Sequence, residues 1–244
     1  MDVKLLAHTQ VSEGFKAILH DAEQARLLMN CTDGQAIALS AIRTCYSANK
    51  PSEIVALEGE KYFKGKATDG KGGNEVDRLI RHIVGSGHTS TLEHLTYTFA
   101  VEGVSRALLA QLTRHRVGFS FSVQSQRYVR FGSNDRSEGF DYVVPDTVLN
   151  NTEAYGEYLS IMDSFQYHYD YLRKLGIPAE DARSVLPNAA CTNLVLTVNL
   201  RSLLDFYSKR RKGKGAQHEI TELAERLREE VVKVEPWTDE FFKN

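Results

Sequence analysis

The sequence predicts an α+β fold with a central, mostly antiparallel sheet flanked by helices. Some segments carry apolar residues at every second position, as strands do, and others carry them at helical spacing. The two kinds of segment do not follow one another as regular β-α-β units, and sheets without such units are usually antiparallel. The 244 residues contain no repeat and no obvious linker, so we expect one domain over 1–244.

The N-terminal third is expected to be helical after one strand. Residues 3–7 are short and apolar, as in an edge strand, and residues 35–47 have apolar side chains at helical spacing. Asn74 is a good N-cap for the helix that follows it. Residues 58–74 are rich in glycine and lysine and predict a surface insertion. Another helix is expected at about 14–29.

The middle of the chain is expected to supply most of the sheet. Residues 95–101 alternate between large apolar and small or polar side chains, which indicates a strand with one buried face. Residues 104–114 predict a helix whose apolar face begins at Val104. Two shorter segments, 126–131 and 140–144, are interpreted as strands of the same sheet.

The C-terminal part combines long helices with one more strand. Residues 152–175 predict a long helix with a single buried stripe, because apolar and aromatic residues recur there at every third or fourth position. A short helix is expected to end before Pro187. The remaining predicted elements are a strand at 192–199 and helices at 201–210 and about 217–233.

Composition limits the classes of function. The 30 basic and 32 acidic residues leave a net charge of −2, whereas nucleic-acid binders usually have a clear basic excess. Cys31, Cys45 and Cys191 are scattered, which indicates neither a disulfide framework nor a zinc site and suits a reducing compartment. The N-terminus does not resemble a signal peptide, and no apolar stretch approaches the roughly 20 residues of a membrane span. We therefore expect a cytoplasmic protein without membrane or nucleic-acid partners.

Residues 111–130 are the most unusual segment, because arginines cluster there with serine and glutamine between them. A guanidinium group matches phosphate bidentately, and hydroxyl and amide groups add neutral donors. Gln111 and Arg114 are three positions apart and share a helix face. This pattern predicts a site for a phosphate-bearing ligand. The alternative is that the cations only stabilise the C-terminal end of a helix.

Two other segments combine polar residues with possible chemistry. Residues 85–94 place His88, Glu93 and His94 behind a glycine turn. These residues lack the His-Glu-x-x-His spacing, and a capped turn is the simpler interpretation, so no metal site is predicted. Residues 197–219 end in a lysine- and arginine-rich loop, which is either solvated or a phosphate patch.

Together these segments resemble the flavin-dependent thymidylate synthases. Arg114-His115-Arg116 followed by Ser125 is similar to the family signature, RHR with a serine after seven residues, and SFSVQSQRY resembles family members almost letter for letter. Five motifs also occur in the family's order. They are GH-x-S/T-x-x-EH at 87–94, Q-x-x-RHR at 111–116, AR-x-VLP at 182–187, TVN-x-RSL at 197–203 and AQ-x-E at 216–219.

The sequence departs from the family pattern in three places. Eight residues, 117–124, separate RHR from the serine, and Val123 stands where the family often has glutamate. Asp205 occupies the position of a flavin-site asparagine. Counting forward from TVN-x-RSL makes Arg210 the substrate arginine, and counting back from AQ-x-E makes it Arg211; we prefer Arg210, because the glycine-lysine loop accommodates an extra residue more easily than a helix does. These departures leave open a relative that binds flavin without activity.

The resemblance implies a homotetramer with active sites between subunits, which reductively methylates dUMP to dTMP. It implies FAD as cofactor, with NADPH and 5,10-methylenetetrahydrofolate as co-substrates. The implied FAD contacts are Ser90, Arg114, His115, Arg116, Asn199, Arg201 and Asp205. The implied dUMP contacts are Gln111, Arg114, Ser125, Gln126, Arg127, Arg183 and Arg210, with Arg211 as the alternative to Arg210.

The resemblance also implies catalytic roles for three residues. Arg210 would stabilise negative charge on the uracil ring at N3, Ser125 would position and polarise the base, and His88 would lie near flavin and folate. No cysteine nucleophile is implied. The rival hypotheses are a nucleic-acid-binding module that uses the arginine-rich segments and a thymidylate synthase that depends on a cysteine.

Overall fold

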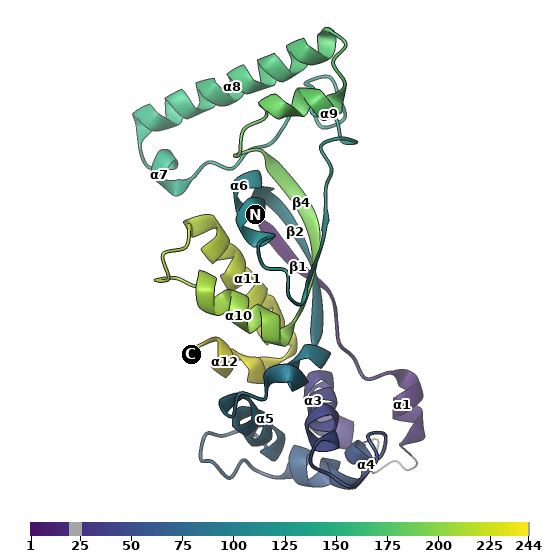
Figure 1. Ribbon diagram of the computed structural model, residues 1–244. Helices are drawn as coiled ribbons and strands as arrows, with labels where there is room; N and C mark the ends of the chain where they lie inside the picture. The colour runs from purple at the N-terminus through teal and green to yellow at the C-terminus, as the bar shows by residue number, and fades with distance from the viewer. Residues whose placement is uncertain (20–25, 244) are drawn as a thin grey trace.

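A four-stranded sheet runs through the middle of an elongated molecule (Figure 1). The computed structural model describes residues 1–19 and 26–243. Neighbouring strands pair antiparallel in the order β1-β2-β4-β3, which confirms the predicted α+β class and antiparallel sheet. The strands are β1 (Asp2–His8), β2 (Thr96–Ser105), β3 (Phe119–Val123) and β4 (Cys191–Asn199).

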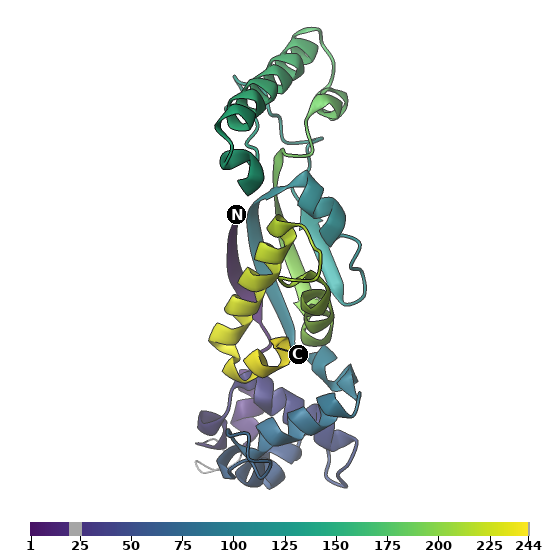
Figure 2. The ribbon, with the colours of Figure 1, turned by 90° about the vertical axis from the view of Figure 1, so that its left-hand side faces the viewer.

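The two central strands bury one face of the sheet against two helices. Side chains alternate between the faces of a strand, so Tyr97, Phe99 and Val101 of β2 are buried, and every second residue of β4 is buried beside them. The helices α10 (Leu200–Arg210) and α11 (His218–Val234) cover this face (Figure 2). The inward residues of α11 are fully buried: Ile220, Leu223, Leu227 and Val231.

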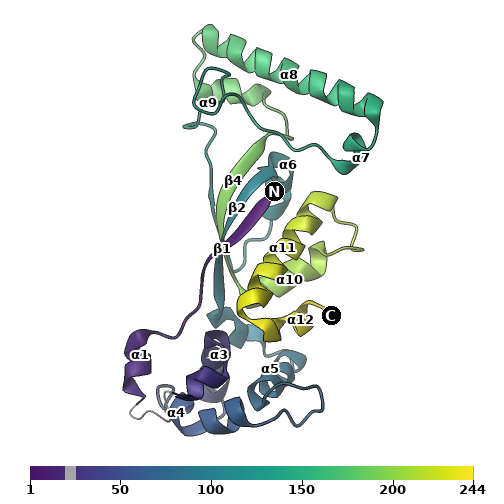
Figure 3. The same ribbon diagram turned by 180° about the vertical axis from the view of Figure 1, so that it is seen from behind.

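The opposite face of the sheet is open in the single chain. Thr98 and Thr197 are half-buried there, and Val195 is 40% exposed. Within the part of the chain that the structure describes, no helix lies across this face, as Figures 1 and 3 show from opposite sides. The face therefore mixes small, polar and apolar side chains without a covering layer.

Helices of the first third of the chain gather at the lower end of the sheet in Figure 1. Asn74 caps α5 through a capping box, which confirms the predicted start of that helix. The predicted helix at 14–29 lies partly outside the described residues. The elements of this end are α1 (Glu13–Ile18), η1 (Leu28–Asn30), α3 (Asp33–Thr44), α4 (Ile54–Gly59), η2 (Glu60–Lys64), α5 (Glu75–Gly85) and η3 (Thr89–His94).

A second apolar cluster lies beyond the upper end of the sheet. It is organised by the long helix α8 (Thr152–Lys174), whose predicted stripe is confirmed by the buried residues Met162 and Tyr169. No helix among the described residues has both the length and the apolar composition to cross a membrane. The remaining elements are α6 (Arg106–Leu112), α7 (Asp146–Leu149), α9 (Ala179–Ala182), η4 (Arg183–Val185), η5 (Pro236–Thr238) and α12 (Asp239–Phe242).

Two predicted strands are wrong. In residues 126–131 the backbone turns, and the N–H of Phe131 donates to the hydroxyl of Tyr169 (3.2 Å) rather than to a neighbouring strand. In residues 140–144 only Tyr142 forms a β-bridge. The strand beside β4 is instead β3, which lies just before the first of these segments. Both segments have alternating side chains, but neither forms a regular ladder. Residues 126–131 bond back to Ser125 in a turn, and residues 140–144 bond to Gln166 of α8 and to Ala189 and Cys191 near the start of β4.

Two other predictions need correction. Val104 belongs to strand β2 and not to the helix that follows, because its backbone pairs with β4. Residues 58–64 were expected in a surface insertion but continue α4 into the π-helix η2. There Tyr62 and Phe63 are buried against the core, and this burial outweighs the helix-breaking tendency of the nearby glycines.

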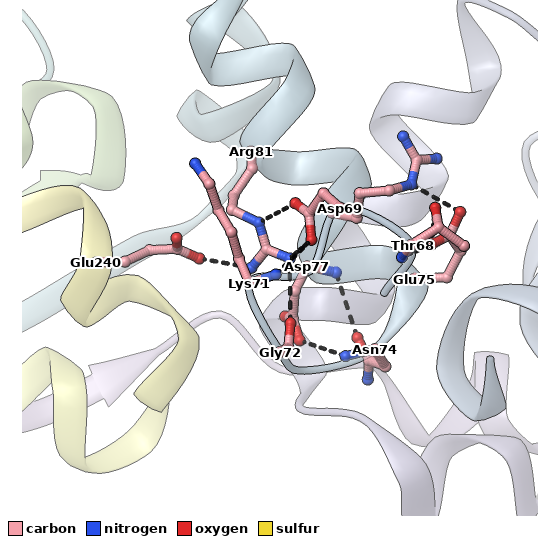
Figure 4. A network of polar contacts seen from close by, with 10 residues as sticks. Thr68, Asp69, Lys71, Gly72, Asn74, Glu75, Asp77, Arg81 and Glu240 are labelled. Carbon is pink, nitrogen blue, oxygen red and sulfur yellow. Dashed lines mark hydrogen bonds and ion pairs between the residues drawn. The ribbon is translucent and has the colours of Figure 1, made fainter. Parts of the chain in front are cut away.

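The rest of the predicted insertion, residues 65–74, is a loop held by Arg81 of α5 (Figure 4). The guanidinium of Arg81 donates to both carboxylate oxygens of Asp69 (2.7 and 2.9 Å), to the carbonyl of Gly72 (3.1 Å) and to Glu240 (3.0 Å). Its side chain is only 10% exposed, so these charge-assisted bonds are shielded from water. The loop is thereby connected to both α5 and α12.

Candidate functional site

The RHR segment follows α6, and a residue from the distant motif AQ-x-E holds the N-cap residue of this helix, Ser105. The hydroxyl of Ser105 accepts the N–H of Leu108 (3.0 Å), and the carboxylate of Glu219 accepts both the N–H (2.7 Å) and the hydroxyl (2.5 Å) of Ser105. An acidic group at a helix N-terminus is stabilising. Glu219 therefore has a structural role: it ties α11 to the helix that positions the arginines.

The turn after RHR packs on the first turn of α10. Gly118 has a φ of +69°, and a Cβ there would lie 2.2 Å from Oγ of Ser202 and 2.5 Å from Nδ2 of Asn199. The N–H of Asn199 donates to the carbonyl of Gly118 (3.2 Å), while its side chain caps α10 by accepting the N–H of Ser202 (2.9 Å). Only glycine fits this contact, which brings two of the sequence motifs together.

The same packing joins His115 to Arg210 at the end of α10. Nε of Arg210 donates to Nε2 of His115 across 3.1 Å. Burial and the positive charge of Arg210 lower the pKa of His115 below its ordinary value. The alternative arginine, Arg211, lies elsewhere: it is the C-cap of α10 and donates to the backbone carbonyl of Lys243 (3.3 Å). Of the two, Arg210 alone contacts the RHR motif.

The segment that begins at His88 forms η3, which contacts the first turn of α10. Arg201 in the first turn of α10 forms an ion pair with Glu93 of η3. At the start of η3, Nδ1 of His88 lies 2.7 Å from the hydroxyl of Tyr46. Sequence reasoning did not identify Glu93 and Tyr46 as partners, because no pattern connects them to Arg201 and His88 in the chain.

We call the resulting set the lower group, because it surrounds the end of the sheet where β3 begins and β4 ends. Its described side chains are mostly exposed, and Asp205 pairs with Lys209 (2.7 Å) on the outer face of α10. Arg114 and Arg116 form no ion pair within the described residues. The members are His88, Ser90, Arg114, His115, Arg116, Asn199, Arg201, Asp205 and Arg210.

A second set, the upper group, lies where β3 ends and α9 begins; it comprises Ser125, Gln126, Arg127 and Arg183. Glu180 of α9 connects two of them: its carboxylate accepts Nε and Nη2 of Arg127 (both 3.0 Å), and its backbone carbonyl accepts Nε of Arg183 (3.0 Å). The hydroxyl of Ser125 accepts the N–H of Arg127 (3.2 Å), and Gln126 is buried. Two cations are thus held close together.

Arg106 is an arginine of this region that sequence reasoning missed. It stands at the start of α6, where its N–H donates to the carbonyl of Ala190 (3.0 Å). Burial, and then the charge of Arg183, lower the pKa of Arg106. No carboxylate forms an ion pair with Arg106 or Arg183 in the part of the chain that the structure describes. The sequence pointed to Arg106 only as a charged residue at the start of an apolar helix.

The two groups are separated by the length of strand β3. Its five residues, Phe119 to Val123, span about 16 Å at the usual rise of a strand. Gln111 lies between the groups on α6, where its amide donates to the side chain of Gln217. The residues predicted to hold one substrate therefore do not meet within one chain. His88, Arg201 and Arg210 belong to the lower group, whereas Arg127 and Arg183 belong to the upper group.

The cysteines and the acidic residues show no catalytic arrangement of their own. Burial raises the pKa of Cys31 to about 12 and that of Cys191 to about 11, so both thiols are protonated at neutral pH and are poor nucleophiles. Cys45 is exposed at the C-terminal end of α3. Over the described residues, no group of three or more His, Cys, Asp or Glu side chains is arranged to hold a metal ion.

Comparison with known proteins identifies the family. The profile of the family described as "Thymidylate synthase complementing protein" matches residues 26–237. The flavin-dependent thymidylate synthase of Geobacter sulfurreducens is 39% identical over 210 residues, which cover 86% of this chain and 82% of that protein. The enzyme of the same name from Clostridium tetani is 31% identical over 231 residues, 87% of this chain and 84% of the relative.

Solved structures share the fold at lower identity. The UMP/dUMP methylase PolB from Streptomyces cacaoi, bound with 5-Br dUMP, superimposes with a TM-score of 0.71 at 22% identity and covers 99% of this chain and 94% of its own. Thymidylate Synthase X from Helicobacter pylori, solved with FAD and dUMP, has a TM-score of 0.66 at 23% identity over 100% of both chains. With the family profile and the close relatives, the ordered motifs lead to one conclusion: this chain belongs to the flavin-dependent thymidylate synthases.

Proposed function

We propose that this chain converts dUMP to dTMP in the cytoplasm with FAD, NADPH and 5,10-methylenetetrahydrofolate, in shared sites of a homotetramer. The observation that carries the proposal is the lower group, in which the RHR turn, the first turn of α10 and η3 converge from three distant parts of the sequence. Binding of a dinucleotide and a nucleotide requires such a set of cations and neutral donors.

The lower group fits FAD in charge and in donor type. Arg114 and Arg116 are exposed cations for the diphosphate, and Asn199 and Ser90 add neutral polar groups. Arg201 would exchange its contact with Glu93 for the cofactor. The chemistry that bound FAD supplies is hydride transfer after reduction by NADPH, while methylenetetrahydrofolate provides the carbon. The proposed FAD contacts are Ser90, Arg114, His115, Arg116, Asn199, Arg201 and Asp205.

Substrate binding would use both groups. Arg127 and Arg183, with Arg106 beside them, suit the phosphate of dUMP, because several guanidinium groups lie together there and only Arg127, among the described residues, is paired with a carboxylate, that of Glu180. Arg210 suits the uracil ring, where its charge would stabilise the anionic form at N3. Ser125 would position the base, and His88 would adjoin the flavin and folate. The remaining proposed contacts are Gln111, Arg114 and Gln126.

A shared site explains why the two groups lie apart in one chain. The open face of the sheet carries Val195, Thr98 and Thr197 without a covering layer, as expected of a surface that meets another subunit. In a closed assembly the upper group of one subunit can adjoin the lower group of the next. The homotetramer is proposed on these two observations and on the resemblance to the family.

The proposed sharing predicts that two inactive variants complement one another. Arg183→Ala removes an upper residue and Arg210→Ala a lower one, so each protein alone is expected to make little dTMP. After unfolding and refolding together, mixed tetramers will contain some sites with both arginines intact, and activity will return. The control is the double variant Arg183→Ala/Arg210→Ala mixed with either single variant. If each site were built from one chain, co-refolding would restore nothing.

The whole proposal is tested by the absorbance of the purified protein. We expect a flavin absorbance band at about 450 nm that bleaches when NADPH is added anaerobically. The bleaching should be faster when dUMP is present. Adding methylenetetrahydrofolate to the reduced protein should then yield dTMP, measured by chromatography. A protein that stays colourless after incubation with FAD, or a reduced flavoprotein that makes no dTMP, would contradict the proposal.

A further inference from the structure

We propose that His115 is a positioning residue for Arg210: its neutral imidazole accepts the Nε–H of Arg210 and so directs the two Nη groups to the substrate. The inference rests on the proposed function, because it assigns Arg210 to the uracil ring. It goes beyond that function by making the central residue of the RHR motif act through another side chain.

The chemistry of the contact determines the proton on His115. Arginine keeps its charge at all ordinary pH values, so Nε of Arg210 is always a donor. The atom 3.1 Å away, Nε2 of His115, must therefore be an acceptor, which only a neutral imidazole with its proton on Nδ1 provides. Once Nε is engaged, Arg210 has its Nη1 and Nη2 groups left for a planar ligand such as a pyrimidine.

Aromatic packing holds the imidazole where it can do this. The ring of His115 meets Phe206 edge-on, with centroids 4.9 Å apart, and lies 6.1 Å from Phe119 of β3. Phe206 is fully buried on α10, one turn before Arg210. The N–H of His115 also donates to the carbonyl of Leu112 (3.0 Å). His115 is thus held between α6 and α10, and Arg210 lies on α10, which limits how far the imidazole can move relative to the guanidinium.

The charged groups around His115 favour the neutral form. Burial, Arg210, Lys209 and Arg114 lower its pKa, whereas Asp205 acts in the other direction. On the side of β3 the ring meets Phe119, which carries no charge. The contact is therefore present above the lowered pKa of His115 and is lost below it, because protonated His115 and Arg210 would then be two cations facing each other. Arg210 would then turn away, and turnover would fall in acid.

The test compares His115→Leu, which cannot accept a hydrogen bond, with His115→Gln, whose Oε1 can accept one but does not titrate. Dithionite-reduced protein is mixed with dUMP and methylenetetrahydrofolate, and single-turnover dTMP formation is followed from about pH 5 to about pH 8, the range in which histidine changes charge. Rates are divided by bound FAD, read from absorbance, so that weaker cofactor binding does not count as slower chemistry.

We expect His115→Leu to be about 10- to 100-fold slower at neutral pH, the usual effect of losing a hydrogen bond to a charged group. His115→Gln should recover most of the rate and lose the fall in acid. The proposal would be overturned if His115→Leu formed dTMP as fast as wild type per bound FAD. It would also be overturned if His115→Gln were as slow as His115→Leu and still lost activity at low pH.

One further measurement does not depend on the reaction. In protein labelled at histidine Cε1, the NMR signal absent from His115→Gln should titrate below the ordinary histidine pKa, and Arg210→Ala should raise that pKa. An unchanged pKa would overturn the contact itself. If Arg210→Ala raised the pKa of His115 but the wild-type protein made no dTMP, the proposed function would be refuted, and the positioning role with it, while the contact would stand.

Discussion

Arg210→Ala is expected to lower the single-turnover rate constant of dTMP formation about 10²- to 10³-fold, which corresponds to about 3–4 kcal/mol of transition-state stabilisation. The guanidinium of Arg210 is held in place by His115, so it does not need to reorganise as charge develops on the uracil ring. Arg210→Lys should recover little, because an ammonium group has no planar fork. The measurement is single-turnover dTMP formation by the reduced protein at saturating dUMP.

Arg211→Ala is the matched control. Arg211 is adjacent in sequence, has the same charge and lies at the same helix end, but its guanidinium contacts the backbone carbonyl of Lys243. Its removal should leave the rate within a few-fold of wild type. The opposite pattern, a slow Arg211→Ala and a normal Arg210→Ala, would assign the substrate role to Arg211 and contradict the structural choice between them.

Glu235→Ala is expected to cause a large loss of stability. Glu235 is 1% exposed, and its carboxylate accepts from the N–H of Gly34 (2.8 Å), the indole N–H of Trp237 (2.5 Å) and the hydroxyl of Thr32. Each buried donor left without an acceptor costs about 1–3 kcal/mol, so three together should cost about 3 kcal/mol or more. At about 2–4 °C per kcal/mol for a chain of this size, calorimetry should show a Tm about 6–12 °C lower.

Two variants control for this effect. Glu229→Ala removes an exposed carboxylate from the same helix, α11, and should change stability by less than about 0.5 kcal/mol. Glu235→Gln keeps the volume but turns an amide donor toward groups that also donate, so an intermediate loss is expected. If Glu235→Ala melted at the wild-type temperature, water would have to satisfy the three donors, and the carboxylate would not be needed to hold α3 to the C-terminal segment.

Stability at Glu235 should also depend on pH with a known sign. Burial raises the pKa of this carboxyl group, although its three donors favour the charged form. The folded protein therefore binds this proton more tightly than the unfolded chain does. The contribution of the group is fully present below the ordinary pKa of glutamate and decreases as the pH rises through the raised value. Glu235→Gln should not show that dependence.

Elements with strong local patterns were predictable from the sequence. Strand β2 alternates large apolar with small or polar residues, α8 and α11 have apolar stripes at helical spacing, and Asn74 caps α5. In the strand and the two striped helices, the periodicity of side-chain direction determines which residues are buried. The predicted strand at 126–131 failed because Tyr169, from a helix far along the chain, binds one of its backbone N–H groups.

The ordered motifs also identified the family, because several uncommon residue combinations occurred in one order. What the motifs could not provide was their geometry. His115 and Arg210 are 95 positions apart, Glu93 and Arg201 are 108 apart, and Ser105 and Glu219 are 114 apart. No local pattern relates such partners, and so the sequence did not show that Glu219 holds Ser105, the N-cap of α6.

The sequence by itself thus determined the class of fold, most helices and the identity of the residues that carry charge and hydrogen bonds. Local periodicity and residue chemistry are enough for this, because they act within one or two turns of the chain. Only the tertiary structure decided that Arg210, and not Arg211, meets the RHR motif, and that the site residues divide between the two ends of β3. Those contacts depend on how the sheet brings distant segments side by side, and burial of its apolar face drives that step.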